Sequence, residues 1–309
     1  MKLRRKIRQA GESILIIIGL CTLPFFSRRS IVGISRVLAD FAFKCARGTR
    51  RLALANLDVA FPEYDNHRKA EIARESFRMF CLTVADMFWF ARRTGDRVST
   101  YVKFDPSFNV FFNTAPAITV TGHFGNWEIL GLAVSYHGAP CSSVAMSLIN
   151  PVADRIVNRL RRSTGQTITG RSGAVRNIMG VLKAGGRIGL LMDQNTLPSE
   201  GGEFVSFFGL QVPVSRVAEI LSKRTGVPVV YAFCTADEQG VYHARAYSSG
   251  KDAKECLTGD VARVFEGEIR SNPGQWLWMY KKWKYVPPGE NPGDYPFYAR
   301  PWRPQNGRL

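Results

Sequence analysis

One short stretch of the chain carries a histidine and a carboxylate at a spacing that suits acid–base chemistry. His123 and Glu128 lie in the sequence Gly-His-Phe-Gly-Asn-Trp-Glu, which begins at Gly122. A carboxylate that accepts a hydrogen bond from one imidazole nitrogen leaves the other nitrogen as a base. The pair therefore indicates a general base, His123, that Glu128 orients. The same spacing also fits a structural histidine paired with a helical glutamate, and the residues alone leave both interpretations open.

The chemistry of a catalytic pair here would differ from that of a serine hydrolase. No Gly-x-Ser-x-Gly nucleophile segment occurs in the chain. The hydroxyl that loses its proton to His123 would then belong to an acceptor substrate, and its oxygen would attack an acyl thioester directly. Backbone N–H groups at the start of a helix would stabilise the oxyanion. We expect no metal at this site, because the chain has no His-Glu-x-x-His motif and no second histidine near the first.

The elements that must position the pair are a strand before it and a helix after it. Residues 117–121 form a β-branched run that predicts a strand, and residues 126–136 predict a helix ended by Gly138. Within one continuous helix, five residues turn through about 500°, so the two side chains would diverge. The pair can meet only if His123 lies in the turn before the helix.

The rest of the chain continues this alternation of strands and helices. We expect further elements at 30–60, 68–92, 152–162, 175–183 and 215–225 (helices) and at 188–192 and 228–233 (strands). This order predicts an α/β fold with a mixed, mainly parallel sheet flanked by helices. In such sheets, functional groups lie in the loops that connect the end of a strand to the following helix. Asp193 lies at such a point, either as a second partner in the site or as a helix cap.

The positive charge is concentrated near the amino terminus. The formal net charge is +17, and residues 1–51 hold twelve Lys or Arg and only two acids. Residues 13–27 are uncharged, but the run is shorter than the roughly 20 residues of a spanning helix. A cleaved signal peptide, a short anchor and an interfacial helix all fit this pattern. We expect membrane attachment through residues 1–30 and a single domain over 31–309. No nucleic-acid motif accompanies the basic charge, so an anionic membrane surface is the expected partner and nucleic acid is not.

The stretch around His123 resembles the His-x4-Asp/Glu motif of the lysophospholipid acyltransferase superfamily, in the form found in bacterial lipid A biosynthesis (late) acyltransferases. Four further segments resemble this family in order along the chain: 50–62, with Asn56 and Pro62; 185–194, which ends in Asp-Gln; 204–209, with Ser206 in place of proline; and 275–284, with Tyr280 and Lys282 in place of histidine and arginine.

The resemblance implies an acyltransferase that moves a fatty acyl chain from acyl carrier protein or CoA to a hydroxyl of a lipid. The family's usual acceptor is the lipid A precursor of lipopolysaccharide biosynthesis. His123 would be the general base and Glu128 its orienting partner, with no metal or other cofactor, at the inner membrane with the catalytic domain facing the cytoplasm. Two alternatives stay open. Tyr280 and Lys282 leave room for another glycolipid or aminolipid acceptor, and the basic charge alone would suit a non-catalytic membrane-binding protein.

Candidate substrate-binding residues cluster after the motif. A single basic stripe on the 152–162 helix would be formed by Arg155, Arg159 and Arg162. This stripe either binds a phosphate group or is simply a solvated face of the helix. Arg161 best matches an arginine that the resembled family places after its Asn-Pro. The remaining candidates for substrate binding are Asn126 and Asp193.

Aromatic residues in the last third of the chain allow two interpretations each. Phe204, Phe207 and Phe208 fit the core better than an acyl channel. A mixture of tryptophans with lysines suits a membrane interface; it comprises Trp276, Trp278, Trp283, Lys281, Lys282 and Lys284.

Overall fold

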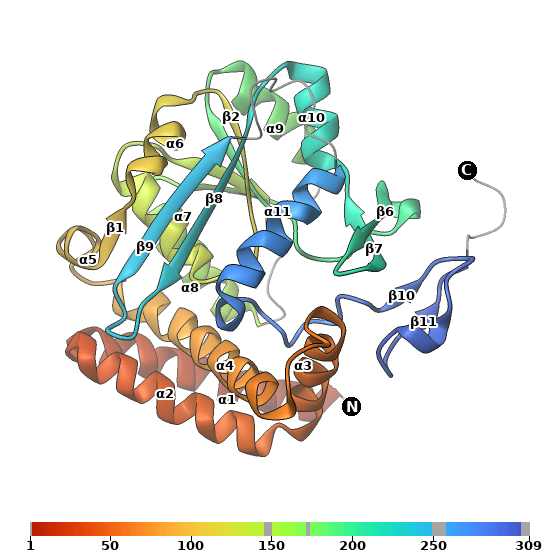
Figure 1. Ribbon diagram of the computed structural model, residues 1–309. Helices are drawn as coiled ribbons and strands as arrows, with labels where there is room; N and C mark the ends of the chain where they lie inside the picture. The colour runs from red at the N-terminus through yellow and green to blue at the C-terminus, as the bar shows by residue number, and fades with distance from the viewer. Residues whose placement is uncertain (1, 145–149, 171–173, 249–257, 304–309) are drawn as a thin grey trace.

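A seven-stranded sheet forms the centre of the molecule in the computed structural model, which describes residues 2–144, 150–170, 174–248 and 258–303 (Figure 1). Its strand order is β1-β9-β8-β2-β5-β3-β4. All neighbours pair in parallel except β8 and β9, which are antiparallel. The predicted α/β class with a mixed, mainly parallel sheet is confirmed. The strands are β1 Val102–Phe104, β2 Ala117–Thr121, β3 Cys141–Val144, β4 Thr167–Thr169, β5 Arg187–Leu191, β8 Val229–Ala236 and β9 Tyr242–Ser248.

Helices cover both faces of the sheet. One face packs against α5 Thr94–Tyr101, α6 Asn109–Asn113 and α7 Trp127–Tyr136. The other packs against α9 Ala174–Lys183, α10 Val217–Thr225 and α11 Thr258–Ser271. Helix α8, Pro151–Arg162, precedes the edge strand β4. Two small pairs stand apart from the main sheet, an antiparallel pair of β6 Gly202–Phe207 with β7 Leu210–Ser215 and a parallel pair of β10 Tyr285–Val286 with β11 Arg300–Pro301.

Strand β2, which leads into the His123 loop, is buried along its whole length. Ile118 and Val120 point into the core beneath α9–α11, and Ala117 points into the core beneath α7. All five residues of β2 are buried. A strand covered on both faces loses the polar alternation of a surface strand, which is why a continuous β-branched run identified it.

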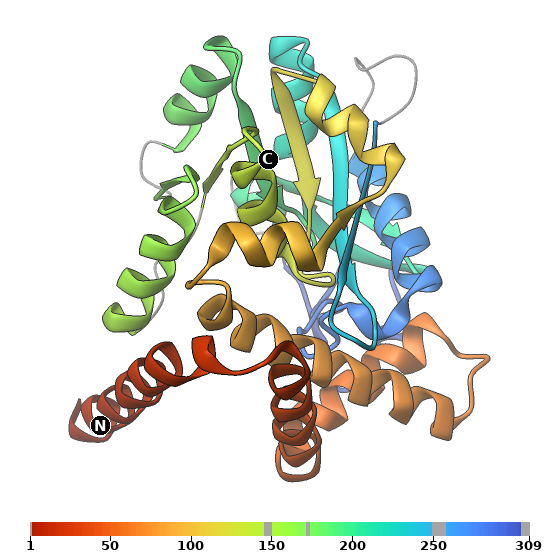
Figure 2. The same cartoon turned by 90° about the vertical axis from the view of Figure 1, so that its left-hand side faces the viewer.

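Four amino-terminal helices form a layer at one end of the sheet (Figures 1 and 2). They are α1 Lys2–Thr22, α2 Arg28–Cys45, α3 Arg47–Ala60 and α4 Asn66–Trp89. The single helix expected over 30–60 is therefore two, because the chain leaves helical geometry at Ala46, where ψ is +62°. Helix α4 contributes Phe77 to one core and Leu82 to the other, so it crosses the end of the sheet and contacts both layers. Short 3-10 turns complete the chain at Leu23–Phe25, Pro106–Phe108, Pro198–Glu200, Pro273–Gln275 (η4) and Pro292–Asp294.

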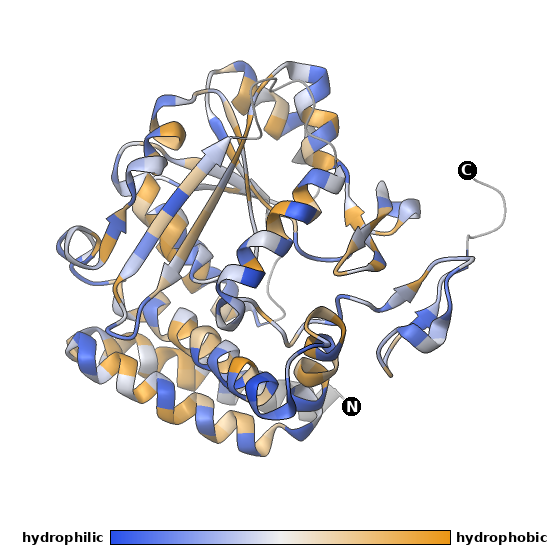
Figure 3. Ribbon diagram, in the orientation of Figure 1, coloured by the Kyte–Doolittle hydropathy of each residue, from blue (hydrophilic) through white to orange (hydrophobic). Residues whose placement is uncertain are grey.

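Large apolar side chains are exposed on α1, on α2 and in the turn between them. They are Ile14, Leu15, Ile17, Ile18, Phe25, Phe26, Val37, Leu38 and Phe41. We call this set the apolar outer face. The colours of Figure 3 show that hydrophobic and hydrophilic residues alternate along both helices. No helix within the described residues combines the length and the hydropathy needed to cross a bilayer.

The tryptophans of the last third are core residues. Trp276, Trp278 and Trp283 are 1%, 0% and 0% exposed. Phe207 and Phe208 are buried in the same cluster, which confirms the core interpretation for these two. The predicted interfacial belt of tryptophans is therefore wrong, because these rings pack on one another and on Phe207 instead of facing outwards.

Candidate functional site

The loop between β2 and α7 carries His123, and its backbone path is fixed by contacts on both sides. Gly125 has a φ of +57°, and a Cβ there would lie 1.9 Å from the carbonyl oxygen of Cys234, so only glycine fits. The Gly125 N–H donates to the Gln275 carbonyl at 2.8 Å, and the Leu277 N–H donates to the His123 carbonyl at 3.0 Å. The Asn126 N–H donates to the Cys234 carbonyl of β8 at 2.8 Å, so the loop is bonded both to β8 and to the segment around η4.

His123 is held by a carboxylate, and that carboxylate belongs to Asp193. The ring Nδ1 lies 2.9 Å from Asp193 Oδ1, and the backbone N–H of His123 donates to Oδ2 at 3.0 Å. Trp276 Nε1 donates to the same Oδ2 at 3.4 Å, and Lys282 Nζ donates to the Asp193 carbonyl at 2.9 Å. With Nδ1 occupied by a carboxylate, Nε2 is the nitrogen left to accept a proton.

The expected contact from His123 to Glu128 is replaced by an ion pair with Arg161. Arg161 Nε and Nη2 donate to the two oxygens of Glu128 at 2.9 and 2.5 Å, and Trp127 Nε1 donates to Oε1 at 3.2 Å. Glu128 is the second residue of α7 and turns towards the end of α8, whereas His123 turns towards the end of β5. The predicted hydrogen bond between His123 and Glu128 is therefore wrong, and the imidazole contacts Asp193 instead.

The electrostatics favour an imidazole that holds a proton firmly. Burial lowers the pKa of His123, but the Asp193 carboxylate, its hydrogen bond and the charge of Glu128 together raise that pKa above its ordinary value. Burial raises the pKa of Asp193, but His123 and Lys282 bring it below its ordinary value. Asp193 is therefore ionised and stabilises a positive charge on His123.

Asn126 anchors the loop from inside. Its Oδ1 accepts the Ile129 N–H at 3.0 Å, which caps α7, and its Nδ2 donates to the Tyr242 hydroxyl at 2.7 Å. Tyr242 in turn donates to Asp86, which also accepts from Arg28. Asn126 is 0% exposed, so the predicted substrate contact is not possible for this side chain. Asp86, Tyr242 and Arg28 were not anticipated, since no motif marks them and they lie in different elements.

The four arginines of α8 divide into two groups. Arg155, Arg159 and Arg162 are exposed and line one open groove on α8, as the predicted stripe requires. Arg161 faces the opposite way, towards Glu128. Burial lowers the pKa of Arg161, but Glu128 raises it above its ordinary value, so this guanidinium stays charged. Within the described part of the chain, no group of three or more His, Cys, Asp or Glu side chains could hold a metal ion.

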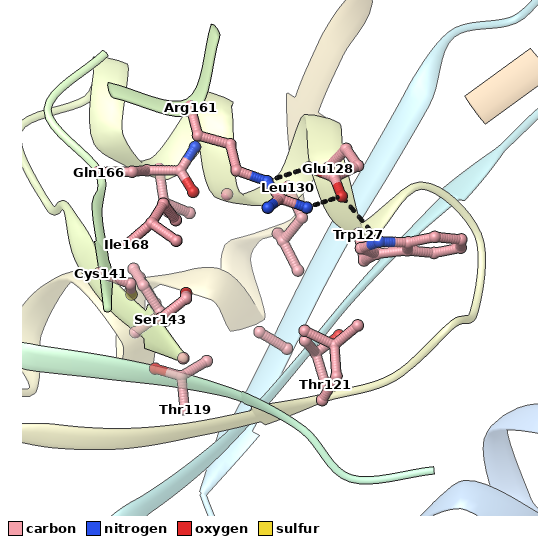
Figure 4. Close-up of a pocket in the computed structure, with 16 residues that line it drawn as sticks. Thr119, Thr121, Trp127, Glu128, Leu130, Cys141, Ser143, Arg161, Gln166 and Ile168 are labelled. Atoms are coloured by element: carbon pink, nitrogen blue, oxygen red, sulfur yellow. Dashed lines mark hydrogen bonds and ion pairs between the residues drawn. The ribbon is translucent and has the colours of Figure 1, made fainter. Parts of the chain in front are cut away.

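A cavity of about 80 Å³ lies between α7 and the sheet, beside the ion pair (Figure 4). At the end next to the loop between β2 and α7, which we call the catalytic loop, the cavity is bordered by Trp127, Glu128 and Arg161. Phe111 also lines the cavity. Its other walls come from β2, β3, β5 and α7, with Gln166 and Ile168 from the region of β4. His123 does not line this cavity, but its ring contacts Trp127, with the ring centroids 4.7 Å apart.

A model of the family described as bacterial lipid A biosynthesis acyltransferase matches residues 1–285. The chain belongs to this family. It is 25% identical over 263 residues to the lipid A biosynthesis myristoyltransferase of Escherichia coli K12, covering 82% of this chain and 80% of the relative. It is 22% identical over 250 residues to the lipid A biosynthesis palmitoleoyltransferase of the same organism, covering 78% and 80%. The protein is an acyltransferase.

In this acyltransferase, the segments that resemble the family meet around Asp193. Asn56 Nδ2 donates to the carbonyls of Trp278 and Tyr280, both at 2.7 Å. The Tyr280 hydroxyl accepts the Asn195 N–H at 3.0 Å, two residues after Asp193. Lys282 holds the Asp193 carbonyl itself. The two departures from the family's tail motif thus support the strand end that carries the carboxylate.

Proposed function

We propose that this enzyme transfers a fatty acyl chain from a thioester to a hydroxyl of a membrane lipid, the lipid A precursor of lipopolysaccharide biosynthesis. The observation that carries the chemistry is the contact between His123 Nδ1 and Asp193 Oδ1, which leaves Nε2 as the base. The proposed acceptor is supported by the names of the relatives, which are enzymes of lipid A biosynthesis.

The reaction needs no enzyme nucleophile. The acceptor hydroxyl gives its proton to Nε2 of His123 while its oxygen attacks the thioester carbonyl, and Asp193 stabilises the imidazolium that forms. The carbon–sulfur bond then breaks, the new ester is released, and the departing thiolate takes the proton back from Nε2. Backbone N–H groups at the amino end of α7 stabilise the oxyanion between these steps.

The donor occupies the region between α7 and α8 in this proposal. The cavity beside Glu128 takes the acyl chain, since its walls are largely apolar and it begins next to the catalytic loop. The exposed guanidinium groups of Arg155, Arg159 and Arg162 bind phosphate, either of the donor's phosphopantetheine arm on acyl carrier protein or CoA, or of the acceptor headgroup.

In this proposal the enzyme lies on the inner membrane with the catalytic domain towards the cytoplasm, and the apolar outer face supports membrane attachment. Leu15 of α1 is 70% exposed and Phe41 of α2 is 67% exposed, which suits shallow insertion among lipid headgroups. The exposed Arg29, three residues after Phe26 of this face, is suited to an anionic surface. Co-sedimentation with vesicles tests this: Leu15→Asp combined with Phe41→Asp should abolish binding, whereas a pair of substitutions on another exposed surface should not.

The decisive experiment measures acyl transfer directly. Purified protein is incubated with lipid A precursor in vesicles and with acyl-carrier-protein or acyl-CoA donors, and products are identified by mass spectrometry. His123→Ala should abolish the product, and the exposed His67→Ala serves as the matched control. An active His123→Ala variant would overturn the mechanism. Acylation of a different glycolipid or aminolipid would replace the acceptor, and absence of any product would favour a binding protein without activity.

A further inference from the structure

A chain of four buried polar side chains runs from the amino-terminal helices to the catalytic loop. Arg28, the first residue of α2, donates to both carboxylate oxygens of Asp86 in α4, at 2.9 Å for Oδ2. The Tyr242 hydroxyl of β9 donates to the same Oδ2 and accepts from Asn126 Nδ2 at 2.7 Å. Asn126 Oδ1 accepts the Ile129 N–H at 3.0 Å. The four side chains belong to residues that are 0% to 6% exposed, so these groups satisfy one another without solvent.

The direction of every hydrogen bond in this chain is fixed by its two ends. A guanidinium at one end and a backbone N–H at the other can only donate. The chain must therefore converge on a group that only accepts, and an ionised Asp86 is that group. Because the Tyr242 hydroxyl donates to Asp86, the Tyr242 oxygen is left to accept. The amide of Asn126 must then turn its NH2 towards that oxygen.

The orientation of the Asn126 amide decides whether α7 is capped. With the NH2 towards Tyr242, Oδ1 faces the Ile129 N–H and satisfies one of the first N–H groups of the helix. With the amide turned over, the NH2 would face that N–H, and two donors would meet without an acceptor. The amino end of α7 holds the oxyanion in the proposed reaction, so loss of the cap would disturb the transition state.

The charge of Arg28 opposes protonation of Asp86. Burial raises the pKa of the Asp86 carboxyl above its ordinary value, and among the groups that act against this rise the charge of Arg28 has the largest effect. Without that charge the carboxyl takes up a proton more readily, and a protonated Asp86 can donate to the Tyr242 oxygen. The chain then has no fixed direction, and the Asn126 amide can adopt either orientation.

Given the proposed acyl transfer, we propose that Arg28 is a positioning residue for this reaction. It does not touch the substrates but acts through the direction that its charge imposes on the hydrogen bonds from Asp86 to Asn126. The amino-terminal helical layer would then contribute to the rate of the reaction as well as to the stability of the fold.

The test measures kcat and KM for acyl transfer in variants whose folding is checked by circular dichroism. Arg28→Met removes the charge and should lower kcat about ten-fold, the equivalent of a lost cap, with little change in KM. Arg28→Lys keeps a positive charge beside Asp86 and should keep most of kcat. Arg245→Met is the matched control, because Arg245 forms the same kind of cluster with Glu268 and Tyr247 on the opposite face of the sheet. It should lower the free energy of unfolding and leave kcat unchanged.

A second substitution separates the direction of the chain from simple packing. An aspartate at position 126 can cap α7 through either oxygen but cannot donate to Tyr242. In the parent, Asn126→Asp should lower kcat, because the Tyr242 oxygen and the new carboxylate are both acceptors. In Arg28→Met the same substitution should raise kcat, because the Tyr242 hydroxyl can then donate to position 126. If Arg28 only stabilised the fold, the two losses would add.

Three results would overturn the inference while leaving acyl transfer intact. The first is a folded Arg28→Met variant with the kcat of the parent. The second is an equal loss of kcat in Arg28→Met and Arg28→Lys, and the third is additive losses in the double variant with Asn126→Asp. If Arg28→Met does not fold, Arg28→Gln, which keeps a donor without the charge, replaces it in the same comparisons. If the parent yields no acylated product with any donor and acceptor, the proposed function itself has failed.

Discussion

The carboxylate of Asp193 accepts hydrogen bonds from both the ring and the backbone amide of His123. One side chain therefore fixes the tautomer of the imidazole and the path of the loop that carries it. The residue that does this is 70 positions away in the sequence, at the end of the strand that pairs with β2.

Replacing Asp193 by asparagine should lower kcat by about 10²–10⁴-fold, the range of a general-base contribution. It should also move the pH profile. His123 is active when unprotonated, so activity of the parent rises with pH through a pKa that lies above the ordinary 6.5. Without Asp193, the group that most raises the pKa of His123 is gone, and burial still lowers this pKa. The rising limb of the pH–activity profile should therefore move to lower pH. The kcat/KM profile measures this, with Asp237→Asn beside His243 as the control.

Replacing Glu128 by glutamine should affect activity by a different route. Glu128→Gln leaves the Arg161 guanidinium without its buried anionic partner. Arg161→Met leaves the Glu128 carboxylate without its cationic partner. We expect each single substitution to lower kcat/KM strongly. Expressed as free energy, the loss in kcat/KM of the double variant should be smaller than the sum of the two single losses. The rising limb should move less in Glu128→Gln than in Asp193→Asn, because Glu128 acts on the imidazole through charge alone. An equal movement would restore Glu128 as the orienting residue.

Removing the Tyr242 hydroxyl should loosen the catalytic loop from within. Tyr242→Phe breaks the contacts to Asn126 and Asp86, and we expect the free energy of unfolding to fall by about 1–3 kcal/mol. Because Asn126 caps α7 next to the site, kcat should fall by about ten-fold, and KM for the donor should change little. Tyr247→Phe, on the same strand, loses a hydroxyl that bonds Glu268 and is the matched control. Equal loss of kcat in both variants would contradict the positioning role.

Lys282 should make the free energy of unfolding depend on pH in the alkaline range. Burial lowers its pKa from 10.5 to about 8, so between these pH values the unfolded chain binds more protons than the folded one. The parent's free energy of unfolding should therefore rise by about 3 kcal/mol relative to that of Lys282→Met across this range. Denaturant unfolding at a series of pH values measures the difference, and the exposed Lys281→Met should show none.

The elements around the site could be predicted because their patterns are local. The β-branched run of β2 and the helix that ends before Gly138 can be recognised from neighbouring residues alone. Asp193 was placed at the site for the same reason, as the end of a strand. Its role could not be predicted, because it depends on Thr121 pairing with Leu191, a register that no local pattern encodes.

Two other errors have physical causes. The tryptophans near the carboxyl end occur among lysines, and composition cannot show that their rings turn inwards while Lys281 turns outwards. Glu128 follows His123 closely in sequence, but the Asn126 cap starts α7 so that Glu128 faces Arg161. In both cases the direction of a side chain, and not the identity of an element, decided the outcome.

The first helix has a consequence for how shortened versions of the protein should be judged. Asn150 caps α8 through its Oδ1, and its Nδ2 donates to the Gln9 carbonyl and the Ser13 hydroxyl of α1. Helix α8 carries Arg161 at its other end. A truncation that begins after Thr22, made to obtain a more tractable protein for crystallisation or inhibitor screening, would remove part of the scaffold of the catalytic domain. Inhibitors selected on such a fragment would be selected against an altered α8.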